Sequence, residues 1–91
     1  MNDNQEIIRL RADIDKTDAK ICELIKKRFK TAKQIGQAKK NAGLAVCDAS
    51  RESAVYELIA AHFDDDNQKE AIKKIYKTII EESKKLQNSK D

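Results

Sequence analysis

Five polar side chains fall on or beside the apolar stripes of predicted helices, and these residues could do chemistry. On the first predicted helix, Arg28 and Lys39 lie at the centre of the apolar stripe, and Arg11 lies about 90° away on its flank. On the last predicted helix, Ser83 and Gln87 continue the stripe in register. Inward cations are normally paired or bind an anion, because an unpaired buried charge is costly. The pattern indicates an anionic ligand held between helices.

A second polar group stands at the start of the predicted middle helix. Asp48 or Ser50 can cap that helix, and a capping residue can still touch a ligand. Arg51 and Glu52 follow, and Glu52 precedes the inward Val55 by three residues. We therefore expect each of the three helices to contribute polar groups to one pocket.

Each candidate also has a structural explanation. Arg28 could form an ion pair with a glutamate of a neighbouring helix, and Lys39 could extend to solvent from a helix end. Arg11 could be an ordinary surface residue, and Ser83 and Gln87 could be the solvated end of the last helix. Asp48 could serve only as a cap. The joint occurrence of such residues on inward faces favours a binding site.

The composition fits one small all-α domain spanning residues 1–91. Proline is absent, glycine occurs only at Gly36 and Gly43, and 38% of the residues are charged. Turn-rich sandwiches and barrels need more of both residue types. The net charge of +3 is mild, but lysine outnumbers arginine 15 to 4. Each arginine is therefore a separate candidate for a bidentate carboxylate contact.

The cysteines and the single histidine give no sign of a metal site. Cys22 and Cys47 lack metal-ligand spacing, and His62 has no partner ligand in the sequence. We expect free thiols in a reducing compartment and a cytoplasmic protein. No apolar run approaches the ~20 residues of a membrane span.

Three helices must position these residues, and their apolar residues recur at intervals of three and four. The expected ranges are about Gln5–Lys40, Ala49–His62 and Gln68–Gln87. The residues expected to face inward are Ile7, Leu10, Ile14, Thr17, Ile21, Leu24, Ala32 and Ile35, then Val55, Leu58 and Ile59, then Ile72, Ile75, Tyr76, Ile79 and Ile80. Asp3 with Glu6 resembles a capping box, Gly43 is expected to end the first helix in a left-handed conformation, and Asn88 begins a frayed tail.

The first helix is too long for the globule that should contain it. About 35 helical residues span roughly 50 Å. A compact chain of this size is only roughly 30 Å across. We therefore expect a second copy of the chain to cover its apolar stripe.

These residues resemble the all-helical (AroQ) class of chorismate mutases, from about Ile8 to Gln87. The segments that carry the resemblance are Leu10-Arg11 with Asp15 and Asp18, Lys27-Arg28, Ile35-Gly36-Gln37-Ala38-Lys39, Val46-Cys47-Asp48, Arg51-Glu52, Ile79-Ile80-Glu81-Glu82-Ser83 and Gln87. The resemblance implies one long, one short and one medium helix per chain, in an intertwined homodimeric bundle with two active sites built from both chains.

The implied reaction is the Claisen rearrangement of chorismate to prephenate, in the shikimate pathway to phenylalanine and tyrosine. It needs no nucleophile, metal or cofactor, and neither nucleic acid nor membrane is an implied partner. By resemblance, Arg28 and Arg11 of the partner subunit pair with the substrate carboxylates. Lys39 bonds a carboxylate and the ether oxygen, Gln87 donates to that oxygen, and Ser83 adds a polar contact.

Residues at the start of the predicted middle helix distinguish this activity from that of another enzyme class with the same fold. By resemblance, Glu52 accepts a hydrogen bond from the ring hydroxyl with Asp48 beside it, and Arg51 organises the loop. Isochorismate-pyruvate lyases share the cations and the glutamine but tend to lack a carboxylate at the position of Glu52. A non-catalytic dimerisation or nucleic-acid-binding module would instead cluster its cations on an outward face.

Overall fold

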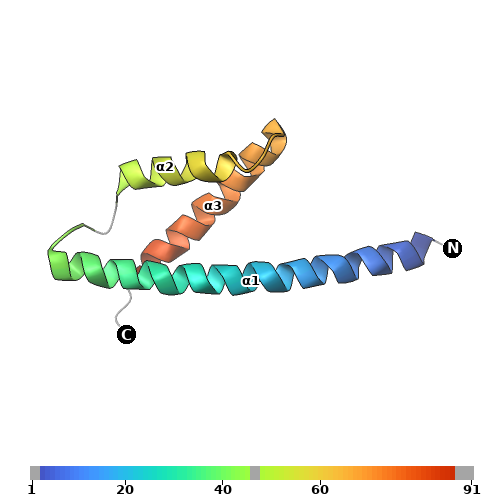
Figure 1. Cartoon of the computed structure of the whole chain (residues 1–91), viewed down its shortest axis with the longest axis horizontal. Helices are drawn as coiled ribbons and strands as arrows, with labels where there is room; N and C mark the ends of the chain where they lie inside the picture. Colours follow the sequence, from blue (N-terminus) through green and yellow to red (C-terminus); the bar gives the residue numbers. More distant parts are fainter. Residues whose placement is uncertain (1–2, 46–47, 88–91) are drawn as a thin grey trace. The chain divides into compact units, whose positions relative to one another are not determined.

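The computed structural model describes residues 3–45 and 48–87, which form three helices and no strand (Figure 1). Helix α1 is long, α2 is short and α3 is of medium length, as predicted. Their bounds are α1 Asp3–Ala42, α2 Ala49–Ala60 and α3 Asp66–Gln87. Within these residues no helix combines the length and the apolar character needed to cross a membrane. The predicted tail from Asn88 lies outside the described residues.

Helix α1 ends as the sequence predicts, at a left-handed glycine. Gly43 has a φ of 70°. Its N–H donates to the carbonyl of Lys40 at 3.1 Å, and the N–H of Leu44 donates to the carbonyl of Lys39 at 2.8 Å. These two bonds form a Schellman motif, which gives hydrogen-bond donors to carbonyls that would otherwise lack one at the helix end.

The start of α1 differs from the prediction. The helix begins at Asp3, two residues before its predicted start. Glu6 forms an ion pair with Arg9 one turn later. The predicted capping box depends on the side chain of Asp3, which lies outside the described side chains, so it stays a prediction.

Aspartates cap the other two helices. Oδ1 of Asp48 accepts the backbone N–H of Arg51 at 3.1 Å, and Oδ1 of Asp65 accepts that of Gln68 at 3.0 Å. Each bond satisfies one of the free N–H groups of a helix N-terminus. Because Asp65 is the cap, α3 begins two residues before its predicted start. Helix α2 ends two residues before His62, where its prediction ended.

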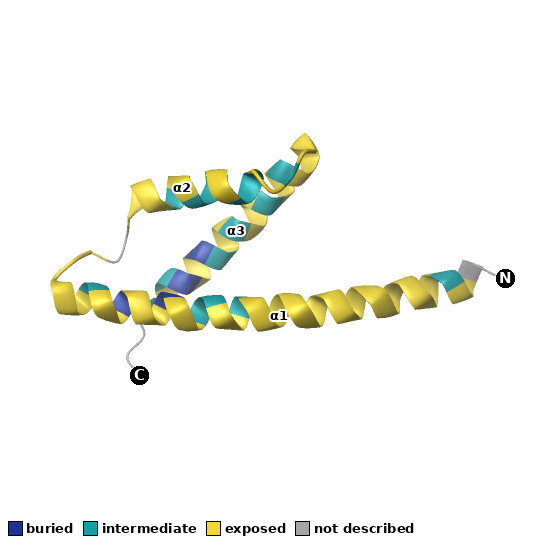
Figure 2. Ribbon diagram, in the orientation of Figure 1, coloured by how far each residue is buried: buried dark blue, intermediate teal, exposed yellow. Residues whose placement is uncertain are grey.

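The chain divides into two units, Met1–Lys30 and Thr31–Asp91, and each is described by itself. The first unit consists of α1 residues, and nearly all its described side chains are exposed (Figure 2). The exposed residues include most of the predicted apolar stripe: Ile7, Leu10, Ile14, Ile21 and Leu24. Within the first unit, no other described residue covers this stripe.

The second unit contains the last turns of α1 together with α2 and α3. Helices α2 and α3 pack together as a hairpin (Figure 1). The buried residues of the second unit are Ala32 and Gly36 on α1 and Ile80 and Ser83 on α3. Leu58 and Ile75 were predicted to face inward but are 59% and 54% exposed. The hairpin shields only a narrow stripe on each helix, and these two residues lie outside that stripe.

Candidate active site

The three candidate cations of α1 have different surroundings. Lys39 belongs to the second unit and is half-buried, and its carbonyl is fixed by the cap at Leu44. Arg28 and Arg11 belong to the first unit, where Arg28 is half-buried and Arg11 is exposed. The side chain of Arg11 is thus accessible to another molecule.

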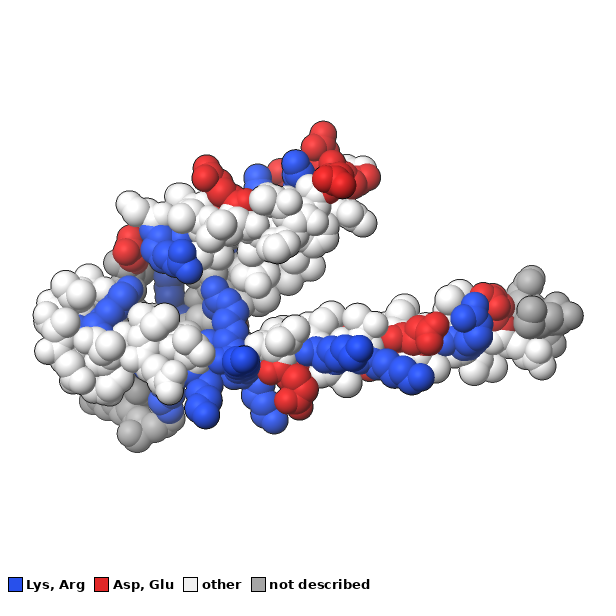
Figure 3. Space-filling model, viewed as in Figure 1, with Lys and Arg blue, Asp and Glu red and all other residues white. Residues whose placement is uncertain are grey.

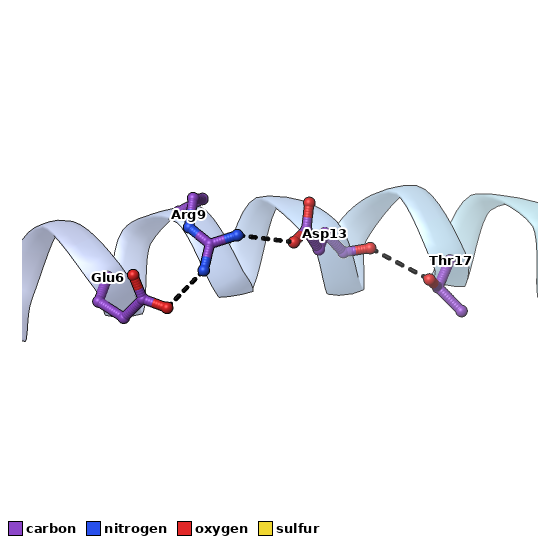
Figure 4. Close-up of polar contacts among 4 residues, drawn as sticks. All are labelled: Glu6, Arg9, Asp13 and Thr17. Carbon is purple, nitrogen blue, oxygen red and sulfur yellow. Dashed lines mark hydrogen bonds and ion pairs between the residues drawn. The ribbon is translucent and has the colours of Figure 1, made fainter.

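Arg9, a fourth cation of α1, forms ion pairs within its own helix. Its guanidinium pairs with Glu6 and lies 3.8 Å from Oδ2 of Asp13. The hydroxyl of Thr17 donates to the carbonyl of Asp13 at 3.1 Å, so the contacts continue along one side of the helix (Figure 4). Exposed pairs at this spacing contribute little to stability. Arg9 is a surface residue of α1.

In the second unit, the end of α3 approaches α1 closely at Gly36, which faces Gln87. A Cβ atom placed on Gly36 would lie 2.9 Å from Cβ and 3.1 Å from Cα of Gln87. Carbon atoms normally approach to about 3.5–4.0 Å. Only glycine allows the end of α3 to lie this close to α1. Gln87 is half-buried as a result.

Ser83 stands one turn before Gln87 on α3 and is buried, with 4% of its surface exposed. Its hydroxyl donates to the carbonyl of Ile79 at 2.7 Å. The alternative that Ser83 is part of a solvated helix end is therefore wrong. A hydroxyl has one hydrogen to donate. Ser83 could donate to a ligand only by turning away from Ile79.

The start of α2 presents three polar residues, and one of them reaches α3. Asp48 and Arg51 are exposed, and Asp48 acts as the cap already described. Glu52 is half-buried, and its Oε1 forms an ion pair with Nζ of Lys84. The structure therefore brings Glu52 to the turn of α3 that lies between Ser83 and Gln87.

The roles of Lys84 and Gly36 are not apparent from the sequence alone. A lysine beside an apolar stripe is too common to indicate an ion pair between helices. Gly36 did carry a signal, because a glycine inside a helix is unfavourable by about 1 kcal/mol and needs a compensating reason. That reason is the close approach of Gln87.

Negative side chains gather at the turn of the hairpin, outside the candidate site residues (Figure 3). They include Asp64, Asp65 and Asp66, at the N-terminus of α3. The helix dipole favours negative charge there. Cys22 is exposed with a free thiol, and Val46 and Cys47 lie outside the described residues.

Comparison with known proteins identifies the family. Residues 10–88 match the model of the chorismate mutase type II family. The chain belongs to that family. The chorismate mutase of Methanocaldococcus jannaschii is 33% identical over 84 residues, covering 91% of this chain and 85% of the relative.

Solved structures share the fold of this chorismate mutase family member. Chorismate mutase (form II) from Thermus thermophilus superposes with a TM-score of 0.88 and 27% identity, covering 94% of this chain and 98% of the other. A conserved hypothetical protein from Pyrococcus furiosus has a TM-score of 0.73 and 31% identity, covering 97% of this chain and all of the other. The resemblance inferred from the sequence is therefore confirmed.

Proposed function

We propose that residues 1–91 act as one chorismate mutase domain, an isomerase that converts chorismate to prephenate. The observation that supports this most directly is the approach of Gln87 to Gly36. Lys39 follows Gly36 by three residues, and residues at this spacing share one side of a helix. The amide of Gln87 thus comes to the segment of α1 that carries Lys39, and both residues are proposed ligands of the ether oxygen.

The reaction is intramolecular, so the protein has two physical tasks. It must hold the flexible dianion in its compact, chair-like shape, which removes rotational freedom before the reaction begins. It must also stabilise the negative charge that grows on the breaking ether oxygen. Lys39 supplies a cation and Gln87 an N–H donor for this charge. Arg28 holds a substrate carboxylate.

We propose that the active form is a homodimer and that Arg11 of the partner subunit completes each site. Two features of the first unit support this: its apolar stripe is exposed, and Arg11 is exposed on the same helix. A second copy of the chain would cover the apolar stripe and receive the side chain of Arg11 in its own active site. Sedimentation at micromolar concentration should give a dimer, and a folded monomer would contradict the proposal.

Glu52 and Asp48 favour the mutase over the lyase. A half-buried carboxylate at the start of α2 can accept a hydrogen bond from the ring hydroxyl of chorismate. Asp48 lies one turn earlier, and Arg51 between them organises the loop. The hydroxyl of the buried Ser83 would supply a further polar contact to a carboxylate after turning away from the carbonyl of Ile79.

The test is direct. Purified protein added to chorismate should remove its absorbance, and the product should be prephenate. Release of pyruvate from isochorismate at a higher kcat/KM would favour the lyase instead. We expect the enzyme to act in the cytoplasm without a metal or a cofactor, so prior treatment with a chelator should leave its rate unchanged.

A further inference from the structure

The ion pair between Lys84 and Glu52 joins two helices at the candidate site. Nζ of Lys84 on α3 meets Oε1 of Glu52 on α2, and the two side chains are 33% and 28% exposed. Oε1 itself is shielded from solvent. By contrast, Lys85 pairs with Glu82 of its own helix, and Lys85 is 73% exposed.

The position of this pair explains how the carboxylate of Glu52 can take part in binding chorismate, which itself carries two negative charges. An ionised Glu52 would repel the two carboxylates of chorismate if its charge were not balanced. A cation on Oε1 offsets the charge and leaves Oε2 as an acceptor.

We infer that Lys84 is a positioning residue for Glu52, whose carboxylate it holds in the orientation in which Oε2 accepts the ring hydroxyl of the substrate. Lys84 acts through Glu52 and does not itself touch chorismate. The inference rests on the proposed function and adds to it a residue that determines preference for the hydroxylated substrate.

The experiment compares chorismate with the analogue in which hydrogen replaces the ring hydroxyl. The variants are Lys84→Met, Lys84→Arg, Glu52→Gln and the double variant Lys84→Met with Glu52→Gln. Lys85→Met is the matched control, because it makes the same change one residue later on an exposed side chain. Thermal unfolding of each variant shows whether it remains folded.

Lys84→Met should lower kcat/KM for chorismate about ten- to a hundredfold, the worth of one hydrogen bond to a charged group. For the analogue, kcat/KM should change much less. The ratio of kcat/KM for chorismate to that for the analogue should therefore fall to the ratio measured for Glu52→Gln. Lys84→Met should cause no further loss in the Glu52→Gln background. Lys84→Arg should restore most of the preference, and Lys85→Met should match the wild type.

Two results would overturn the inference while leaving the proposed function intact. One is an active Lys84→Met enzyme with an unchanged preference for chorismate. The other is an equal loss on Lys84→Met in the wild-type and Glu52→Gln backgrounds, which would show that Lys84 acts independently of Glu52. A folded wild-type protein that consumes no chorismate would instead refute the proposed function, and the inference with it.

Discussion

Replacing Gly36 with alanine adds one methyl group at the point where α3 meets α1. The new carbon would lie 2.9 Å from Cβ and 3.1 Å from Cα of Gln87. Ordinary carbon contacts begin near 3.5 Å, so the end of α3 must move by about 0.5 Å or more. A change of rotamer cannot relieve the contact, because Cα belongs to the backbone.

Two effects on stability partly cancel. Overpacking of this kind costs about 1–3 kcal/mol. Alanine in place of glycine inside a helix returns about 1 kcal/mol. The free energy of unfolding should therefore fall by no more than about 2 kcal/mol, which would leave the variant folded.

The effect on the reaction should be much larger. If Gln87 donates to the ether oxygen, a displaced amide loses part of a bond that matters most in the transition state. Loss of one such donor costs about a hundred- to a thousandfold in kcat. We expect Gly36→Ala to lower kcat by about ten- to a hundredfold, because a shifted donor retains part of its effect.

The assay measures kcat and KM for Gly36→Ala, Gln87→Ala and the double variant, with thermal unfolding of each. The double variant should be no slower than Gln87→Ala. Gly43→Ala is the control, because a Cβ there meets nothing within 4 Å and only the positive φ is strained. It should lose stability but keep its kcat. A folded Gly36→Ala enzyme within twofold of the wild-type kcat would refute the reasoning.

Three further predictions concern the proposed substrate ligands. Arg28→Lys keeps the charge but loses the bidentate contact, so kcat/KM should fall by the equivalent of about 1.5–3 kcal/mol, and a change of less than twofold would show a structural role. Arg11→Ala and Lys39→Ala should each be nearly inactive, and refolding them together should restore some activity, because one site of each heterodimer would carry both residues. No recovery in verified heterodimers would place both residues in one chain. Gln87→Glu should be most active in acid and fade as its carboxylate ionises, since an unperturbed glutamate has a pKa of about 4.3 and only the protonated form donates. Profiles of kcat/KM against pH for both enzymes check this, and an unchanged rate at about pH 8 would exclude Gln87 as the donor.

The helices and their ends could be predicted because their signals are local. Asp48 and Gly43 each act on backbone groups within a few residues, so the sequence contains the whole interaction. Leu58 and Ile75 were assigned inward wrongly, since periodicity defines a face but not how much of it a neighbour covers. Hairpin packing decides that coverage.

The candidate site was predictable to a smaller extent, for a related reason. Ser83 was found because a polar residue interrupts an apolar stripe, and its burial agrees with that prediction. Lys84 was missed because it stands on the flank, where a lysine is ordinary. Its partner Glu52 lies 32 residues away in the sequence (84 minus 52), so only tertiary structure pairs them. The roles of Arg11 and Arg28 stay predictions.

The exposed stripe of the first unit also bears on how the enzyme would respond to dilution. Ile14 and Leu24 face solvent in the single chain. In the proposed homodimer, their burial would be gained only on association, so folding and assembly would be linked by mass action. The monomer would forgo that burial, and a solitary helix segment is only marginally stable in water. For such a protein, the concentration in the cell would help to determine the folded fraction. At concentrations well below the dissociation constant of the dimer, a chain that loses its partner would also lose its fold.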